Sequence, residues 1–334
     1  MKIIGVENKI LFLKKRLMAH SFRLAAFLLF LLSVLGALAF FIFVDKNNVG
    51  NVEVLRGKEL STHGRWSVDN ENKEIQKAIK FDDEQKDTGK LVDAVKPTKV
   101  QSKDYTQIFP DFYTRRPEKQ LVYDKTIYLT FDDGPSERTP EILDILKKYN
   151  IKATFFVVGK TDDFSKECMK RIVEEGHTIA MHSYTHDFKK IYSSVESFLE
   201  DMHKLFNLIY EVTGVKPSIF RFAGGSRNGF NKSNYKEIIS EMLRRGFDYF
   251  DWNICNNDSV SKSLLPVEKC VDNVCKYSSK YNSAVVLMHD SKPKTTTVEA
   301  LPKVIEELKN QGFSFRNLTN EVYPCDFALA KPYA

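Results

Sequence analysis

Residues that can bind a metal ion or transfer a proton follow five short β-rich runs of the sequence. They are Asp132-Asp133-Gly134-Pro135, His182-Ser183-Tyr184-Thr185-His186, Arg221-Phe222-Ala223-Gly224-Gly225, Asp251-Trp252-Asn253 and His289-Asp290. Taken singly they are weak evidence, because Asp-Asp-Gly-Pro is typical of a turn and histidine pairs are often incidental. Two imidazoles four residues apart do, however, suit one metal ion. Since all five segments follow strand ends, we expect them to meet at one edge of a parallel sheet.

The segments that must position these residues alternate between strand and helix patterns. The predicted strands are 126–130, 153–158, 178–181, 218–222, 247–252, 284–288 and 313–315. The predicted helices are 139–149, 164–175, 195–213, 235–245, 264–279 and 298–311. This alternation predicts one α/β domain over residues 121–322, with a parallel sheet that is either open or closed into a barrel. Residues 323–334 would form a C-terminal tail.

The N-terminal region predicts a membrane anchor. Residues 1–23 hold six Lys and Arg residues against one Glu, and residues 24–44 hold no charged residue. About 20 apolar residues cross a bilayer, and positively charged flanks stay inside. We therefore interpret 1–23 as a cytoplasmic basic tail, 24–44 as a single transmembrane helix, and the remainder as extracytoplasmic. The alternative is a cleaved signal peptide, because residues 37–39 read Ala-Leu-Ala, a small-x-small cleavage pattern.

Residues 45–120 are polar and mixed in charge, without sustained apolar periodicity. We expect them to form an extracytoplasmic stalk. As a flexible coil, a segment of this length has an end-to-end distance of roughly 50 Å. Such a stalk would hold the domain off the membrane and within a surrounding polymer layer.

Composition and missing motifs exclude several classes of protein. A hydrophobic content of 43% argues against wholesale disorder. The net charge of +6 comes mainly from residues 1–23, so no nucleic-acid-binding surface is predicted. The five cysteines form no CxxC pair, which gives no support for a zinc ribbon. No Gly-x-Ser-x-Gly elbow, P-loop or dinucleotide fingerprint follows a predicted strand, which argues against serine esterases, nucleotidases and dehydrogenases.

The five segments, in this order, resemble the motifs of the polysaccharide deacetylases of carbohydrate esterase family 4, which share the NodB homology domain. Thr-Phe-Asp-Asp-Gly-Pro and His-Ser-x-x-His carry most of the resemblance, which covers residues 121–322. The resemblance implies an irregular (β/α) barrel of about seven parallel strands. It also implies removal of N-acetyl or O-acetyl groups from carbohydrate polymers with one divalent metal ion, commonly zinc. Cobalt, nickel, manganese and ferrous iron suit the same ligands and stay open.

The resemblance assigns the central roles residue by residue. Asp133, His182 and His186 would be the metal ligands, a set that leaves coordination sites open for water and substrate. Asp132 would be the general base. His289 would be the general acid that protonates the leaving sugar amine, a task suited to an imidazole with a pKa near neutrality.

The same resemblance implies supporting roles for five further residues. Arg221 would pair with the general base and keep it ionised, while Asp251 would orient the general acid. The backbone N–H of Gly224 would donate to the developing oxyanion. Trp252 and Leu287 would form the apolar pocket for the acetyl methyl group.

Ala223 departs from the pattern, because the family usually has proline at this position. We expect alanine to loosen the loop that presents the oxyanion donor. The function expected is deacetylation of a cell-envelope glycan, with the N-acetylglucosamine units of peptidoglycan as first choice. Poly-N-acetylglucosamine, chitin oligomers and acetylated xylan are alternatives. From another class, the alternative is a catalytically silent glycan-binding module. Protein partners stay open.

Overall fold

Parallel strands and connecting helices make up most of the described chain. The structure is a computed structural model that describes residues 89–94, 96, 103–260 and 263–327. The strands are β1 Lys90–Asp93, β2 Lys119–Val122, β3 Thr126–Asp132, β4 Thr154–Val158, β5 Thr178–Ser183, β6 Ile219–Phe220, β7 Asp248–Tyr249, β8 Ile254–Cys255, β9 Ser283–His289 and β10 Ser314–Phe315. The helices are α3 Arg138–Tyr149, α4 Asp163–Glu174, α5 Phe188–Ile191, α6 Val195–Thr213, α7 Tyr235–Arg244, α8 Val267–Ser278 and α9 Thr295–Asn310.

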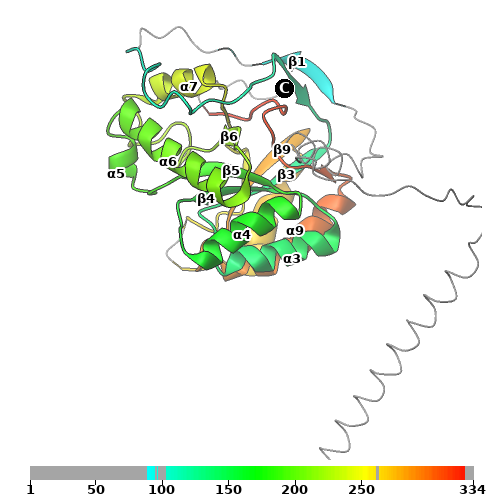
Figure 1. The fold of residues 1–334 in the computed structure, drawn as a ribbon. Coiled ribbons are helices and arrows are strands. Elements are labelled where there is room, and N and C mark those ends of the chain that lie inside the picture. The colour runs from blue at the N-terminus through cyan, green and yellow to red at the C-terminus, as the bar shows by residue number, and fades with distance from the viewer. Residues whose placement is uncertain (1–88, 95, 97–102, 261–262, 328–334) are drawn as a thin grey trace, which may run out of the picture. The chain divides into compact units, whose positions relative to one another are not determined.

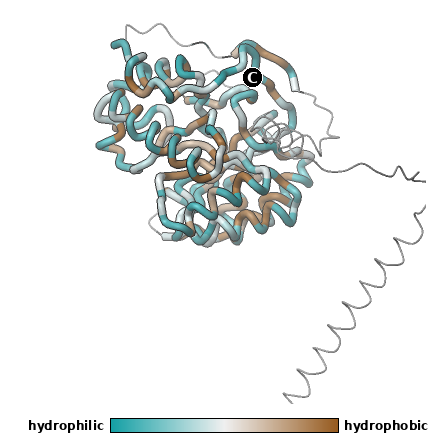
Figure 2. The backbone as a smooth tube through the Cα atoms, viewed as in Figure 1, coloured by the Kyte–Doolittle hydropathy of each residue, from teal (hydrophilic) through white to brown (hydrophobic). Residues whose placement is uncertain are grey.

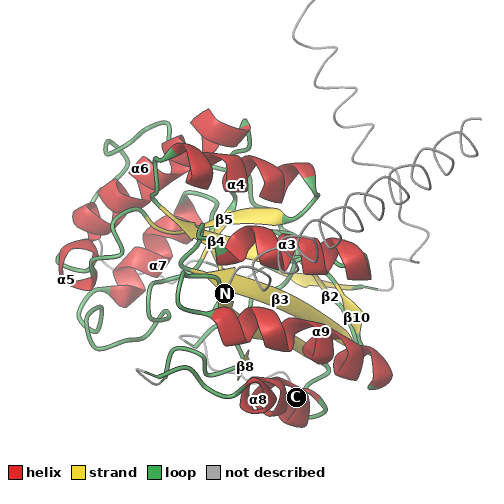
Figure 3. Cartoon of the chain, turned by 90° about the horizontal axis from the view of Figure 1, so that it is seen from below, coloured by secondary structure: helices red, strands yellow, loops and turns green. Residues whose placement is uncertain are grey.

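The main sheet is parallel and follows the order β7-β6-β5-β4-β3-β9-β8, with β10 beside β3. Helix α3 packs between α4 and α9 on one side of this sheet (Figure 1). Residues 250–253 carry the chain from β7 at one edge to β8 at the other, and within the described ranges these two strands do not pair. The fold is therefore α/β with a curled, incomplete barrel (Figure 3), which confirms the expected class.

Alternation along the strands divides the buried side chains into two layers. Leu129, Phe131 and Phe155 belong to the larger core beneath the helices. Tyr128 and Phe156 point to the other side, into the smaller core inside the curled sheet. Strands buried on both faces are typical of parallel sheets covered by helices. Hydrophobic and hydrophilic stretches alternate along these helices (Figure 2), as expected when one face of each is buried.

Local signals in the sequence set the helix boundaries. Helix α6 has the predicted range: the Ser194 side chain accepts a hydrogen bond from Ser197 N at its start, and Gly214 adopts a φ of 72° at its end. At the start of α4, the Asp162 side chain accepts from Ser165 N. The predicted strand 247–252, in contrast, is too long. This segment holds only the two-residue strand β7 and then leaves the sheet, and a further short strand, β8, follows.

Residues 103–120, which we expected in the stalk, pack against the domain. Phe112 is fully buried and Tyr105 nearly so. The guanidinium of Arg245, also fully buried, donates to the backbone carbonyls of Tyr105, Ile108, Phe109 and Phe112, at 2.7 to 3.2 Å. Strand β1 adds an antiparallel pair with β2. The structured region therefore begins before the expected boundary at residue 121.

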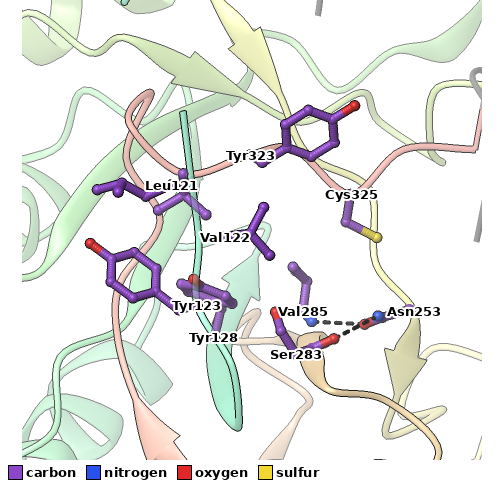
Figure 4. A pocket seen from close by; sticks show the side chains of 10 residues that line it. Leu121, Val122, Tyr123, Tyr128, Asn253, Ser283, Val285, Tyr323 and Cys325 are labelled. Carbon is purple, nitrogen blue, oxygen red and sulfur yellow. Dashed lines mark hydrogen bonds between the residues drawn. The ribbon is translucent and has the colours of Figure 1, made fainter. Parts of the chain in front are cut away.

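The described start of the expected C-terminal tail also belongs to the domain. Tyr323 N donates to Leu121 O, and Cys325 O accepts from Asp251 N. Beneath this segment lies a cavity of about 20 Å³ lined by residues that include Tyr128, Val285 and Cys325 (Figure 4). A space of this size holds about one water molecule, so a sugar cannot bind there.

The predicted basic tail, the transmembrane helix 24–44 and the stalk up to residue 88 lie outside the described residues. Among the residues that are described, no helix combines the length and the apolar character needed to span a bilayer. The anchor therefore stays a prediction.

We predict that Arg245→Met destabilises the domain by about 3–5 kcal/mol, because it removes the buried one of the two arginine partners of Glu241 and leaves several carbonyls without a donor. Arg245→Lys should restore only part of this loss, since an ammonium cannot reproduce the fork of N–H groups. Denaturant unfolding of the full chain measures both effects. The control is Arg115→Met at an exposed position. Equal stability of the Arg245 and Arg115 variants would contradict the prediction.

Candidate active site

The three predicted metal ligands converge at the carboxyl ends of β3 and β5. One ligand atom from each of Asp133, His182 and His186 lies within 4.8 Å of the others. The Nε2 atoms of His182 and His186 lie 3.4 and 3.1 Å from Oδ1 of Asp133. That oxygen is buried and accepts no hydrogen bond of good geometry. Two imidazole nitrogens and an otherwise unsatisfied carboxylate oxygen around one point fit a divalent metal ion.

Charge and burial oppose each other at these ligands. Burial would raise the pKa of Asp133, but the two neighbouring imidazoles outweigh it and lower that pKa well below its usual value. Burial would likewise lower the pKa of His182, whereas Asp132 and Asp133 raise it. The protonation state of each of these residues therefore depends on the charges of its neighbours.

The backbone of two ligands is held in an uncommon conformation. Asp133 has a φ of 73° and His186 a φ of 52°, both in the left-handed region that non-glycine residues rarely adopt. Next to Asp133, a Cβ on Gly134 would lie 2.1 Å from Oδ2 of Asp290, so glycine is required there. The surrounding contacts, rather than local preference, must fix these ligands.

Asp201 on α6 supplies many of these contacts, although no motif in the sequence marks this residue. Its carboxylate accepts from Ser183 Oγ, Tyr184 N, and the N and Oγ1 of Thr185, at 2.6 to 3.0 Å. Ser183 Oγ in turn accepts from His186 N at 2.8 Å. One buried carboxylate thus shapes the whole segment between the two histidines.

The second supporting contact fixes the ring of His182. Its Nδ1 lies 3.0 Å from the backbone oxygen of Arg221. Since a carbonyl oxygen only accepts, Nδ1 must carry the proton, which leaves the lone pair of Nε2 directed at Asp133. Such a contact to the far nitrogen is usual for histidines that bind metals.

Asp132 and Arg221 form the predicted ion pair, with 2.8 Å between Oδ1 and NH1. Both side chains are buried. The guanidinium also donates to Thr130 Oγ1, Phe250 O and Asp251 O, at 2.7 to 3.0 Å. The other oxygen of Asp132, Oδ2, faces the metal ligands, 3.9 Å from Nε2 of His182.

His289 lies on β9, in register with Asp132 on the neighbouring strand β3. Its Nδ1 is 2.6 Å from Oδ1 of Asp258, whose Oδ2 accepts from His289 N. Burial would lower the pKa of His289, but the hydrogen bond and charge of Asp258 raise it to about 9. The pKa of Asp258 is lowered by the same pair, although burial acts in the opposite direction.

The expectation that Asp251 orients His289 is therefore wrong, and Asp258 takes this position. Asp251 instead accepts from Ser226 N and Oγ and from Phe327 N. The physical reason is the break after β7: the chain crosses the open edge and forms β8, and Asp258 follows that strand. The polar run from Asn256 to Ser259 was the available signal, but it was missed because β8 was not predicted.

Asp290 follows His289 and joins the loop after β3 to the end of β9. Its N donates to Asp132 O, and its carboxylate accepts from Thr139 Oγ1. Burial raises the pKa of Asp290 to about 7, against the effect of Thr139. This residue holds the Asp132–Asp133 segment from behind.

The residues predicted to line the acetyl pocket lie beside the same strand ends. Leu287 is buried and, two residues before His289, lies on the same face of β9. The Trp252 ring contacts the Phe327 ring edge-to-face at 4.9 Å. Gly224 has a φ of 77° and is exposed, which leaves its predicted role as an oxyanion donor open.

The loop around Ala223 is restrained without the usual proline. The Ala223 carbonyl accepts from the hydroxyl of Tyr192 at 2.7 Å and from Nδ2 of Asn228 at 3.1 Å. Ala223 itself is buried. These contacts argue against the loosening that we expected from alanine.

Comparisons with known proteins identify relatives of this chain. A family model of polysaccharide deacetylases matches residues 119–242. A peptidoglycan-N-acetylglucosamine deacetylase of Bacillus cereus strain ATCC 14579 is 34% identical over 208 residues, which cover 61% of this chain and 73% of that protein.

Solved structures extend the similarity to the fold. The catalytic domain of a peptidoglycan N-acetylglucosamine deacetylase from Eubacterium rectale ATCC 33656 is 33% identical, with a TM-score of 0.59 over 66% of this chain and 100% of that one. The polysaccharide deacetylase Bc1974 from Bacillus cereus is 31% identical, with a TM-score of 0.55 over 61% and 97%. The chain therefore belongs to the polysaccharide deacetylase family and is a carbohydrate deacetylase, a hydrolase.

Proposed function

We propose that this enzyme removes N-acetyl groups from N-acetylglucosamine units of peptidoglycan and that it depends on a divalent metal ion, with zinc as first choice. The observation that carries the chemistry is the convergence of Asp133, His182 and His186 between a carboxylate, Asp132, and a paired imidazole, His289. The names of the relatives support the choice of glycan. A hydrolysis needs a proton acceptor and a proton donor near one reacting carbon, and this site offers both.

The chain's own residues divide the proton transfers between them. A divalent ion held by Asp133, His182 and His186 would polarise the acetyl carbonyl oxygen and acidify the attacking water. Arg221 occupies Oδ1 of Asp132, so Oδ2, which faces the ligands, is the oxygen that accepts a proton. Asp258 occupies Nδ1 of His289, so Nε2 is the atom that protonates the leaving amine.

The pKa of His289 fits its assignment as the proton donor. With a pKa of about 9, His289 carries its proton at neutral pH and can act as an acid. We assign the backbone N–H of Gly224 to the oxyanion, and Leu287 and Trp252 to the acetyl methyl group, as the family resemblance implies. Leu287 is buried and Trp252 is half-buried, and an apolar surface formed by the two would select the small methyl group and exclude water.

We also propose that the enzyme acts outside the cell membrane, tethered by residues 24–44. The support is the uncharged run itself, with six basic residues among the 23 that precede it. An enzyme held there meets the cell wall first. Poly-N-acetylglucosamine, chitin oligomers and acetylated xylan are the substrates to test against peptidoglycan. The silent glycan-binding module is disfavoured, because binding alone needs neither Asp132 nor His289.

Metal removal tests the proposed function. The full chain is stripped with a chelator and reloaded with zinc or cobalt, and acetate release is followed from peptidoglycan, N-acetylglucosamine oligomers and acetylated xylan. We expect acetate from the reloaded protein only, with peptidoglycan as the preferred substrate. Absence of acetate from all three, with metal bound, would favour the binding module. Faster release from xylan would overturn the choice of glycan.

We predict that Asp132→Asn lowers kcat at least about 100-fold while bound metal stays near the wild-type level, because an amide cannot accept the proton and Asp132 is not a ligand. Metal content by elemental analysis and acetate release measure the two effects. Asp272→Asn, at an exposed site, is the matched control. Loss of metal in Asp132→Asn would mean that the roles of the two adjacent aspartates are exchanged.

The pH dependence tests the pair of His289 and Asp258. Because Asp132, Asp133 and above all Asp258 raise the pKa of His289 to about 9, the acid form is present below that pH and is lost as the pH rises through it. In Asp258→Asn the pKa should fall toward its ordinary value. The alkaline limb of the kcat/KM profile should then move to lower pH by at least about one unit. An unmoved limb would exclude His289 as the titrating acid.

A further inference from the structure

Two phenylalanine rings extend from the metal site toward solvent. The Phe188 ring lies edge-on to the ring of His186, with 5.3 Å between centroids. The centroid of the Phe230 ring lies 5.3 Å from that of the Phe188 ring. Phe230 is 52% exposed, a high value for a side chain of this size and polarity. Successive ring contacts thus link the candidate metal ligand His186 to the half-buried Phe188 and the exposed Phe230.

The exposed ring belongs to a loop that is held in place. Asn228 Oδ1 accepts from Phe230 N and Asn231 N, and Asn228 Nδ2 donates to the carbonyls of Ala223 and Gly225. Asn231, which is fully buried, accepts from Asn228 N and donates to Ser226 O. Side-chain amides that close a loop in this way fix its backbone, so the exposure of Phe230 is built into the loop.

The inner ring is fixed as well. A Cβ on Gly224 would lie 2.7 Å from Cε1 of Phe188, so the absence of a side chain there admits the ring. Phe188 also contacts Tyr192 edge-on, with 6.1 Å between centroids. Phe188 starts α5, whose first N–H groups are capped by the Asp187 side chain. Both rings are therefore presented on supports that do not need to rearrange on binding.

A large apolar side chain kept in water beside a reaction centre has a cost that a binding role explains. A site that binds a glycan needs an apolar surface of this kind. One face of a pyranose ring consists of C–H groups with little affinity for water, and these groups pack against the apolar surface. The electron-rich face of an aromatic ring attracts those C–H groups, and a rigid ring loses little entropy on binding.

We propose that Phe188 and Phe230 form a sugar-stacking subsite, which binds the glycan unit next to the unit that is deacetylated. The inference rests on the proposed function and specifies how that site selects a polymer. The position of the subsite follows from the ring contacts. Because these contacts start at the metal ligand His186, the subsite lies next to the reacting unit. Phe230 provides the exposed stacking face and Phe188 supports it from the metal side.

The experiment compares chain-length dependence between variants of the full, metal-loaded protein. Wild type, Phe230→Ala, Phe230→Leu and Phe230→Trp are assayed for acetate release from N-acetylglucosamine dimers and hexamers. For the hexamer, Phe230→Ala should raise KM about five- to tenfold, with a much smaller change in kcat, because stacking acts on ground state and transition state alike. Phe230→Trp should restore KM, whereas Phe230→Leu should not.

Tyr210→Ala is the matched control, since Tyr210 is an exposed aromatic residue, 46% accessible, on α6. Its KM should equal that of the wild type. A wild-type KM for the hexamer in Phe230→Ala, or in Phe230→Leu, would overturn the subsite.

A binding measurement separates this inference from the proposed function. Titration calorimetry with the hexamer compares Asp132→Asn with the double variant Asp132→Asn/Phe230→Ala, so no turnover is required. Weaker binding by the double variant supports the subsite even if acetate release fails, in which case only the proposed function falls. Equal binding, together with normal acetate release by the wild type, rejects the subsite alone.

Discussion

Arg221 is fully buried, and its guanidinium joins strand β3 to the segment that follows β7. It pairs with Asp132 and contacts Thr130 on β3, and it binds the carbonyls of Phe250 and Asp251 after β7. Its own carbonyl fixes the ring of His182. A buried guanidinium is stable only when its partners are in place, and removing one of them typically costs several kcal/mol. This constraint ties the open edge of the barrel to the candidate metal site.

At the carboxyl ends of these strands, residues of the same type have different roles. Asp132 and Asp133 are adjacent in sequence, yet Asp132 forms an ion pair with Arg221 and Asp133 faces two imidazoles. His182 has its Nδ1 on a backbone carbonyl, whereas His289 has its Nδ1 on a carboxylate, which raises the pKa of His289. A neutral imidazole suits a metal ligand, and a protonated one suits a general acid. The contact of the far ring nitrogen therefore orients the ring of His182, whereas for His289 it also favours the protonated form.

The loop after β6 connects catalysis with glycan binding. Asp251 holds the start of this loop through Ser226, and Asn228 holds both the Ala223 carbonyl and the segment that carries Phe230. The segment that would stabilise the oxyanion and the segment that would stack a sugar therefore share one rigid support. This network replaces the restraint that a proline at position 223 would provide.

The sequence by itself determined the α/β class, most strand and helix positions, and the residues that converge as the candidate metal site. These follow from local properties: hydrophobic alternation, helix capping, and polar residues at the ends of parallel strands. Tertiary structure decided which aspartate meets His289, because the gap between β7 and β8 is set by sheet curvature and not by spacing. It also decided that residues 103–120 pack on the domain, since Arg245 meets its carbonyl partners across more than 130 residues of chain. Contacts between segments so far apart depend on the assembled sheet, and no local pattern in the sequence encodes them.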